Sequence, residues 1–354
     1  MKIIHYSDKK TELTDEVFLH FTGYMLGISC LAKSDIGIKR IYQLKERPDS
    51  KGLIMLCDSL EMVCKELQLT IDNKRLNRFL NRIWPGNITI ILENHNPAYQ
   101  RISVNNKVAV RVPDNHLLRE FIYHHGPLVS TSVNKNGKSP CLTLKEVEET
   151  YADWFDFALL PTGFKSALGT PSTLIDIKSM SLSNHLNILR EGSMSEDQLN
   201  NISNSINISF ACVGNICRSP IAEYYAKSLR DYGSNQVSFT SCGLLEDGIK
   251  ISRNSKIILQ EWGINSDIHR SRRITQQILA DNDYILTMTE EIKHRILNEF
   301  PDGKSKIFSL GEFTGFNEDI EDPYGMDLSY YEKTALQIKE MIDRLSMMII
   351  NNEV

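Results

Sequence analysis

Two patterns of apolar residues alternate along most of the chain. Short apolar runs of about four to eight residues, bounded by polar or glycine-containing stretches, are typical of buried strands. Longer stretches in which apolar residues recur every three or four positions are typical of amphipathic helices. In the first half, these patterns predict strands at residues 51–58, 87–94, 107–114 and 126–134, and helices at 35–47 and 73–84.

The second half alternates more regularly. A strand pattern and a helix pattern follow each other from residue 206 almost to the end of the chain. Such alternation predicts an α/β domain with a doubly wound parallel sheet, which binds ligands at the carboxyl ends of its strands. The predicted strands are 206–213, 236–243 and 280–289, and the predicted helices are 219–233, 252–264, 290–300 and 331–350.

A polar segment separates the two halves. The sequence EGSMSEDQLNNISNSIN, residues 191–207, is rich in turn-forming residues and is typical of a linker. A chain of 354 residues is also longer than a typical single domain. We therefore expect one domain at residues 1–192 and a second at 207–354, joined by a linker at 193–206.

The composition narrows the class of protein. With 41% hydrophobic and 24% charged residues, the chain resembles an ordinary globular protein and not a disordered one. The first residues are too charged for a signal peptide, and no apolar run approaches the ~20 residues of a membrane span. Seven scattered cysteines favour free thiols in a reducing compartment. These features predict a cytoplasmic protein with no membrane partner.

The segment FACVGNICRSP, residues 210–220, is the strongest candidate for chemistry. It joins the first predicted strand of the second half to the helix that follows. Two cysteines in such a turn are compatible with a metal site, a redox pair or a phosphate-binding loop. No further group of Cys or His at ligand spacing accompanies them, which argues against a zinc site.

A phosphate-binding loop explains most of the residues in this segment. The amides of a loop at a helix N-terminus attract an anion, and the same field stabilises a thiolate on Cys212 at the strand end. Arg218, six positions later, can offer its planar guanidinium to two phosphate oxygens. Gly214 permits a tight backbone path, and the Ser219 hydroxyl can reach the sulfur. The residues therefore predict a nucleophilic cysteine beside a phosphate site.

This loop resembles the signature of the low-molecular-weight protein tyrosine phosphatases. The resemblance extends over about residues 206–350 and implies that family's four-stranded, doubly wound parallel sheet. Further segments fall where the family has similar ones: SCGL (241–244), WGINSDIHRSRRIT (262–275), ADNDYILTMT (280–289) and EDPYG (321–325).

The resemblance implies a two-step mechanism without a cofactor. Cys212 attacks phosphorus to form a cysteinyl-phosphate, while Arg218 and the loop amides bind the phosphoryl oxygens. Asp322 protonates the leaving oxygen and then activates the hydrolytic water, and Pro323 stiffens its loop. The implied phosphate loop also contains Val213, Gly214, Asn215, Ile216, Cys217 and Ser219.

The substrate is less sharply indicated than the reaction. Ile216 is typical of the phosphotyrosine enzymes of the family, and Tyr324 is the expected wall of the substrate pocket. The DPYG spacing is similar to that of the arginine phosphatases, which are the alternative. We expect a phosphoprotein substrate carrying phosphotyrosine. Cys217 has two readings, a reversible disulfide partner of Cys212 or a small buried filler.

Six segments of the first half resemble the YrdC-like threonylcarbamoyl-adenylate synthases. They occur in the family's order and spacing over about residues 15–192, and they imply a twisted mixed sheet with helices. The segments are LKERPDSKGLIML (44–56), WPGNITIIL (84–92), VAVRVPDN (108–115), GPLVSTSVNKNG (126–137), TPSTLIDI (170–177) and ILREG (188–192).

This second resemblance implies a condensation of L-threonine, bicarbonate and ATP, the ATP entering with Mg²⁺ and leaving pyrophosphate. The product supplies a threonylcarbamoyl group for tRNA, so tRNA or tRNA-modification proteins are implied partners. Cationic side chains suit a triphosphate, and hydroxyl and amide groups suit phosphate or amino-acid recognition. The implied ATP- and threonine-binding residues are Thr22, Lys45, Arg47, Lys51, Arg111, Ser130, Ser132, Asn134, Ser172 and Arg190.

One segment departs from the synthase pattern. Where the family has a stretch like Pro-Thr-Glu-Thr-x-Tyr-Gly-Leu-Gly, this chain reads FTGYMLGIS, residues 21–29. Thr22 and Gly27 fit, whereas the proline, the acidic residue, the second threonine and the aromatic residue are absent. The alternative for this half is therefore a domain that only binds a nucleotide or RNA, or that positions the phosphatase.

Overall fold

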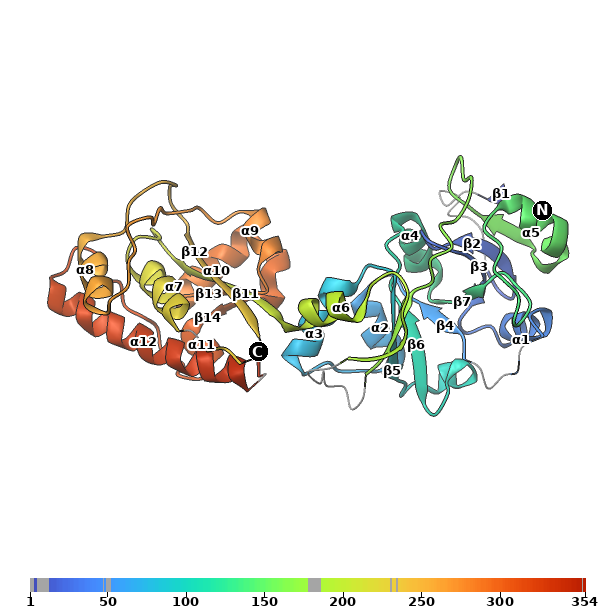
Figure 1. Cartoon of the computed structure of the whole chain (residues 1–354), viewed down its shortest axis with the longest axis horizontal. Helices are drawn as coiled ribbons and strands as arrows, with labels where there is room; N and C mark the ends of the chain where they lie inside the picture. The colour runs from blue at the N-terminus through green and yellow to red at the C-terminus, as the bar shows by residue number, and fades with distance from the viewer. Residues whose placement is uncertain are drawn as a thin grey trace. The chain divides into compact units, whose positions relative to one another are not determined.

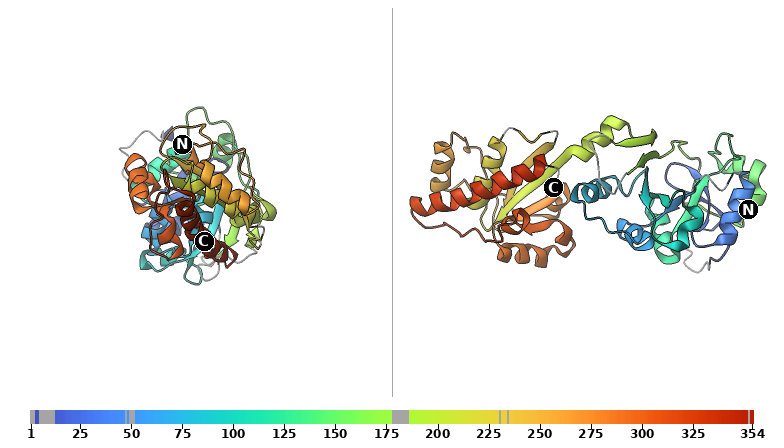
Figure 2. Two further views of the ribbon diagram at one scale, coloured as in Figure 1. Left: turned by 90° about the vertical axis from the view of Figure 1, so that its left-hand side faces the viewer. Right: turned by 90° about the horizontal axis from the view of Figure 1, so that it is seen from below.

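The chain folds into two compact units, Met1–Ser203 and Asn204–Val354. Figure 1 and Figure 2 show the first in blue to green and the second in yellow to red. None of the described helices is both long and apolar enough to span a membrane. The computed structural model describes residues 3–4, 13–46, 48, 52–177, 186–229, 231–233, 235–351 and 353–354.

A mixed sheet forms the first unit. Its described strands lie in the order β1-β8-β2-β3-β7-β4-β6-β5-β9-β10, with both parallel and antiparallel neighbours. The mixed α/β sheet implied by the synthase resemblance is thereby confirmed. The strands are β1 (Ile3–Ile4), β2 (Phe18–Phe21), β3 (Leu26–Leu31), β4 (Ile54–Leu56), β5 (Ile88–Glu93), β6 (Lys107–Arg111), β7 (Leu128–Ser132), β8 (Phe157–Leu159), β9 (Thr173–Asp176) and β10 (Asn187–Arg190).

Polar side chains cap the helices of this unit where they begin. The Ser34 side chain accepts a hydrogen bond from the Gly37 N–H at the start of α1, and Asn115 accepts one from Leu118 at the start of α4. The helices are α1 (Asp35–Leu44), α2 (Leu60–Leu67), α3 (Lys74–Ile83), α4 (His116–His125), α5 (Leu144–Tyr151) and α6 (Glu196–Asn204), with 3-10 turns η1 (Pro97–Ile102) and η2 (Ala152–Trp154).

The two faces of this sheet have different surroundings. Successive residues of a strand point to opposite faces. In β4, Met55 joins the larger apolar core, to which α1, α2 and α3 contribute, whereas Leu56 joins a smaller cluster with Phe121 of α4. Ile54, two residues before Leu56 in β4, points to the same face as Leu56 and lines a cavity. The cavity therefore lies on the face of the sheet opposite the larger core.

The second unit contains a four-stranded parallel sheet in the order β12-β11-β13-β14. The register pairs Cys212 with Gly243 and Thr287 with Ser309, so the carboxyl ends of the strands meet at one edge. From the central strand β11, the sheet is extended by β12 on one side and by β13 and then β14 on the other. The strand order therefore reverses beside β11, which makes the carboxyl ends of the strands there a topological switch point and confirms the doubly wound fold. The strands are β11 (Ser205–Cys212), β12 (Gln236–Gly243), β13 (Tyr284–Thr287) and β14 (Ile307–Ser309).

Helices cover this sheet on both sides. Helix α7 contacts β11, β12 and α12, and helix α10 contacts β13 and β14. Because parallel crossovers are right-handed, α7 and α10 lie on opposite faces. The helices are α7 (Arg218–Ser228), α8 (Arg253–Glu261), α9 (Gln276–Asp281), α10 (Glu290–Glu299), α11 (Leu310–Thr314) and α12 (Leu328–Ile350), with the 3-10 turn η3 (Pro301–Ser305).

Some boundaries differ from those predicted. The strand expected at residues 280–289 is shorter, because Ala280 and Asp281 end helix α9 and the strand itself is Tyr284–Thr287. The fourth strand, β14, is too short to leave an apolar pattern. Helix α6 occupies most of the segment expected as a linker, and its Leu199 is buried in the core of the first unit.

Candidate functional site

The loop after β11 packs directly over the end of β12. Gly243 makes this close approach, because a Cβ there would lie 2.8 Å from the carbonyl oxygen of Val213 and 2.9 Å from the amide nitrogen of Asn215. The N–H of Leu244 donates to the same Val213 carbonyl at 2.8 Å. The loop is therefore held against the neighbouring strand and not left open.

Asn215 braces the loop from inside. Its backbone is in the left-handed region, with φ of 51°, which asparagine tolerates better than most residues. The side-chain Nδ2 donates to Ser219 Oγ at 2.9 Å and to Ser241 Oγ at 2.7 Å, and Oδ1 accepts from the Arg272 N–H at 2.9 Å. His269 Nε2 lies 2.8 Å from the Asn215 carbonyl. Asn215 is thus fixed at every polar atom of its side chain.

This bracing places two polar groups against the Cys212 sulfur. The Asn215 N–H donates to Cys212 Sγ at 3.2 Å, and Ser219 Oγ lies 3.0 Å from it. The thiol is only 3% exposed. Helix α7 begins beside it, and no side chain caps its first turn at Cys217. Donors and a helix N-terminus favour a thiolate over a thiol.

Arg218 reaches from α7 to the loop that carries Asp322. Its Nη1 donates to the Ile320 carbonyl at 2.8 Å, and its Nη2 donates to Asp322 Oδ2 at 2.5 Å. The Arg218 side chain is 3% exposed and that of Asp322 is 43% exposed. The buried Nε of Arg218 has no hydrogen-bond partner among the described residues. A buried donor without a partner is costly, and an oxyanion would satisfy it.

The remaining predicted residues of this loop have clear positions. Cys217 is buried, its sulfur lies 3.2 Å from Tyr331 Oη, and burial raises the pKa of its thiol. Ile216 is partly buried against the apolar core. Tyr324 is 70% exposed, and its N–H donates to Asp322 Oδ1 at 3.3 Å. Cys217 is therefore a protonated thiol at neutral pH, hydrogen-bonded to Tyr331.

The structure thus brings Cys212, Asn215, Arg218, Ser219 and Asp322 together from segments far apart in the sequence. Sequence reasoning did not assign three of the partners that hold Asn215, although all three lie in segments that carried the family resemblance. These supporting residues are Ser241, whose hydroxyl donates to the buried Glu223 carboxylate, His269 and Arg272.

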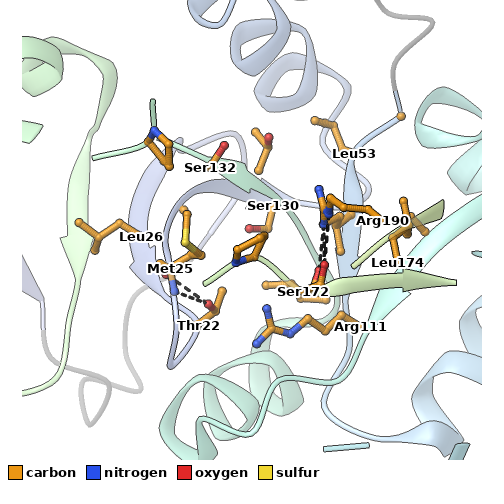
Figure 3. A pocket seen from close by; sticks show the side chains of 18 of the residues that line it. Thr22, Met25, Leu26, Leu53, Arg111, Ser130, Ser132, Ser172, Leu174 and Arg190 are labelled. Atoms are coloured by element: carbon orange, nitrogen blue, oxygen red, sulfur yellow. Dashed lines mark hydrogen bonds between the residues drawn. The ribbon is translucent and has the colours of Figure 1, made fainter. Parts of the chain in front are cut away.

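The first unit has a separate candidate site, the cavity of about 530 Å³ on its sheet (Figure 3). The register pairs Ile54 of β4 with Ala109 of β6 on one side and with Ser130 of β7 on the other, and all three line the cavity. The residues predicted for ATP and threonine that also line it are Thr22, Arg111, Ser130, Ser132, Ser172 and Arg190.

Arg111 is the most deeply buried cation of this cavity. Its Nε donates to the Gly86 carbonyl at 3.0 Å, and its guanidinium lies 5.8 Å from the centre of the Tyr24 ring. The buried Nη2 has no hydrogen-bond partner among the described residues. Burial lowers the pKa of Arg111 to about 10, so the side chain is still charged at neutral pH. This orphaned donor on the cavity wall is suited to an oxyanion.

Arg190 and Ser172 form a second polar wall. Arg190 Nη2 donates to the Ser172 carbonyl at 2.9 Å and to Ser172 Oγ at 3.2 Å, as the dashed lines in Figure 3 show. Ser172 Oγ also lies 2.7 Å from Thr89 Oγ1. On the opposite side, the Thr22 hydroxyl is held in the turn by the Met25 backbone.

Two of the predicted residues that the structure describes, Lys45 and Asn134, do not line the cavity. The Lys45 ammonium is buried and donates to the backbone carbonyls of Ser132 and Asn134, as well as to Asn134 Oδ1 at 3.0 Å. Lys45 and Asn134 thus support the strand end from behind Ser132. Arg47 and Lys51 lie outside the described residues.

The segment at residues 21–29 contains the last residue of β2, the turn at residues 22–25 and the first four residues of β3. The place that a Cβ on Gly23 would occupy lies 2.8 Å from Asp114 Oδ1, so a carboxylate from another segment fills the space beside the missing acidic side chain. The aromatic ring of this turn belongs to Tyr24, which packs against Arg111. The departure from the synthase pattern therefore leaves a polar, cationic cavity in place.

Among the described residues, no group of three His, Cys, Asp or Glu side chains is placed to hold a metal ion. All seven cysteines are free, and the six other than Cys64 are buried. The two sites therefore rest on hydroxyl, amide, thiol and guanidinium groups, which are the groups that bind phosphates and carboxylates.

Two families of known proteins match this chain, one in each half. The Sua5/YciO/YrdC family, described as telomere recombination, matches residues 20–192, and the low molecular weight phosphotyrosine protein phosphatase family matches residues 207–354. The chain belongs to both families.

Individual relatives support both assignments. A threonylcarbamoyl-AMP synthase of Vibrio campbellii is 33% identical over 51% of this chain and 94% of its own length. A protein-arginine-phosphatase of Geobacillus stearothermophilus is 34% identical over 39% of this chain and 93% of its own length. A low molecular weight protein-tyrosine-phosphatase of Acinetobacter johnsonii is 32% identical over 38% of this chain and 92% of its own length.

Proposed function

We propose that this chain is a bifunctional enzyme. The second unit hydrolyses phosphomonoesters on proteins through a cysteinyl-phosphate, and the first unit makes threonylcarbamoyl-AMP from L-threonine, bicarbonate and ATP. The observation that carries the phosphatase proposal is the set of donors around Cys212, together with the unpartnered Nε of Arg218. These groups match a thiolate nucleophile and a phosphoryl group held next to it.

The geometry supports a proposed role for one residue in each step of the phosphatase reaction. The Cys212 thiolate attacks phosphorus, the S–P bond forms and the bond to the leaving oxygen breaks. A phosphoryl group that takes the Nη2 donor of Arg218 releases Asp322 Oδ2 from its ion pair. Asp322 then takes a proton from solvent and passes it to the leaving oxygen as the bond to phosphorus breaks. Water next attacks phosphorus, Asp322 takes its proton, and the S–P bond breaks to give inorganic phosphate.

Replacement of Asp322 tests this assignment. Asp322→Asn keeps the shape but cannot donate the proton, so we expect turnover of phenyl phosphate to fall about a hundredfold or more. Turnover of p-nitrophenyl phosphate should fall much less, because its leaving group needs little protonation. Glu321→Gln is the matched control, since Glu321 is the neighbouring exposed carboxylate. Equal losses on both substrates, or equal losses in both variants, would contradict the role of Asp322.

The substrate side chain is proposed to be phosphotyrosine, with phosphoarginine as the second candidate. The second candidate is favoured by the arginine-phosphatase relative and by the exposed aliphatic side chains of Leu245 and Ile249 after β12. Leu245 lies close to the phosphate loop, because its N–H donates to the Val213 carbonyl at 3.2 Å. Phosphate release from otherwise identical phosphotyrosine and phosphoarginine peptides decides between them, and a faster rate on the arginine peptide would overturn the tyrosine assignment.

The synthase proposal is supported by the cavity of the first unit. Its walls offer the unpartnered Nη2 of Arg111, the guanidinium of Arg190 and several hydroxyls to a triphosphate and an amino-acid carboxylate. Mg²⁺ fits this site only as a companion of the ATP phosphates, since the described residues form no carboxylate cage for it. The product would supply a tRNA-modifying reaction.

An assay of pyrophosphate release tests the synthase. The intact chain should release pyrophosphate only when ATP, threonine and bicarbonate are all present, and Arg111→Ala should lower this rate about a hundredfold. Arg101→Ala serves as the control, because Arg101 is an exposed side chain outside the cavity. Absence of pyrophosphate release from a chain that retains phosphatase activity and a cooperative melting transition would favour the nucleotide- or RNA-binding alternative.

A further inference from the structure

A histidine that sequence reasoning did not single out lies under the wall of the synthase cavity. His20 is on β2 and is fully buried. The register pairs His20 with Gly27 of β3 and Gly27 with Ser132 of β7, so these residues form one row on the same face of the sheet. His20 is therefore on the cavity face, one strand removed from β7.

Gly27 allows His20 to reach across β3. A Cβ on Gly27 would lie 2.4 Å from His20 Nε2 and 2.9 Å from Ser130 Oγ, so any larger residue would occupy the space between them. Through this gap His20 Nε2 lies 2.8 Å from Ser130 Oγ. Ser130 in turn lines the cavity. The imidazole thus contacts a wall residue of the cavity from the side, across β3.

The hydrogen-bonding pattern defines the direction of this contact. His20 Nδ1 is buried without a partner among the described residues. Burial, assisted by the charge of Arg111, lowers the pKa of His20 to about 3, so the ring is neutral and carries one N–H. A buried N–H without an acceptor is rarer than a buried acceptor without a donor. The proton therefore belongs on Nε2, where it is donated to Ser130 Oγ.

We propose that His20 is a positioning residue that makes the Ser130 hydroxyl a donor toward an oxyanion of the bound substrate. With its oxygen accepting from His20, the Ser130 O–H is directed into the cavity, whose wall also carries the orphaned Nη2 of Arg111. The oxyanion is a phosphate oxygen of the nucleotide or the carboxylate of the amino acid. This inference rests on the proposed synthase function for the identity of the substrate.

A mutant cycle on the full-length chain tests the proposal. Ser130→Ala and His20→Leu should each lower kcat/KM for pyrophosphate release about tenfold, and the double variant should be no worse than Ser130→Ala alone. His20→Gln, whose amide can donate from the position of Nε2, should recover most of the loss. A rise in KM for ATP places the oxyanion on the nucleotide, and a rise in KM for threonine places it on the amino acid. His124→Gln, an exposed histidine of α4, is the control.

A second measurement does not depend on catalysis. In the chain labelled with ¹⁵N-histidine, the signal that disappears in His20→Gln should show a neutral ring protonated at Nε2 and should not titrate between about pH 5 and 8. Titration in that range, a proton on Nδ1, or additive losses in the mutant cycle would overturn the proposal. If the wild-type chain releases no pyrophosphate, the synthase function fails, and the NMR result together with calorimetric binding of ATP to the Ser130→Ala chain still decides the role of His20.

Discussion

Replacing Cys212 with serine is expected to lower phosphatase turnover by at least about 10⁴-fold, because it removes the nucleophile of the first step. The serine hydroxyl would be held by the same two partners, Asn215 N–H and Ser219 Oγ, so the loop should keep its shape. A hydroxyl stays protonated where a thiol becomes a thiolate. The variant should therefore bind phosphate but not form the phosphoenzyme, which mass spectrometry of the quenched reaction can check.

The chain offers a contrasting cysteine and an internal reference for this experiment. Cys217→Ser should cost less than about tenfold, because the Cys217 sulfur contacts the Tyr331 hydroxyl and not the reacting phosphate. Pyrophosphate release by the first unit of the same preparation reports the amount of chain, and a cooperative melting transition shows that the second unit is folded. A Cys212→Ser enzyme that turns over at the wild-type rate would exclude the cysteinyl-phosphate mechanism.

Arg218→Lys is expected to lower kcat for the phosphatase about a thousandfold, although it keeps the positive charge. The planar guanidinium of Arg218 fixes the directions of three donors. Nη1 donates to the Ile320 carbonyl, Nη2 donates to Asp322, and Nε has no partner among the described residues. A lysine ammonium cannot reproduce that planar arrangement, so it cannot position the general acid and bind two phosphoryl oxygens together. Loss of a single oxyanion donor typically costs 10²–10³-fold, and this change disturbs more than one.

The matched control for Arg218→Lys is Arg295→Lys, since Arg295 is exposed on α10. It should leave kcat and KM unchanged. Phosphate or vanadate inhibition provides the second readout, because Arg218→Lys should weaken inhibition as well as slow turnover. If Arg218→Lys retained full kcat, charge alone would suffice and the planar fork would have no role.

The parts of the fold that the sequence predicted share a physical cause. In the second unit, parallel strands buried on both faces leave continuous apolar runs, and amphipathic helices separate them. In the first unit, β2 and β3 enclose the turn at residues 22–25, and β8, β9 and β10 are only three or four residues long. Such short strands show no distinct period, and tertiary pairing determines them.

The candidate sites also contain residues that the local sequence predicts and residues that only tertiary contacts bring together. Cys212 and Arg218 are predictable because the strand, the loop and the helix that carry them are consecutive in the sequence. The His20–Ser130 contact is not predictable, because it depends on β2, β3 and β7 being adjacent and on a missing side chain at Gly27. For Lys45 the sequence suggested a contact that the structure does not show. This cation was expected to bind phosphate, but its ammonium group donates hydrogen bonds to the backbone carbonyls of Ser132 and Asn134.

The bracing of Asn215 has a consequence for how the phosphatase acquires its reactivity during synthesis. The loop residue is held by Ser241, His269 and Arg272, which follow it by 26, 54 and 57 positions. A nascent chain that has exposed only β11 and α7 therefore lacks the groups that shape the loop. The phosphate-binding shape of the loop around Cys212 therefore arises only when the rest of the unit has emerged from the ribosome and folded.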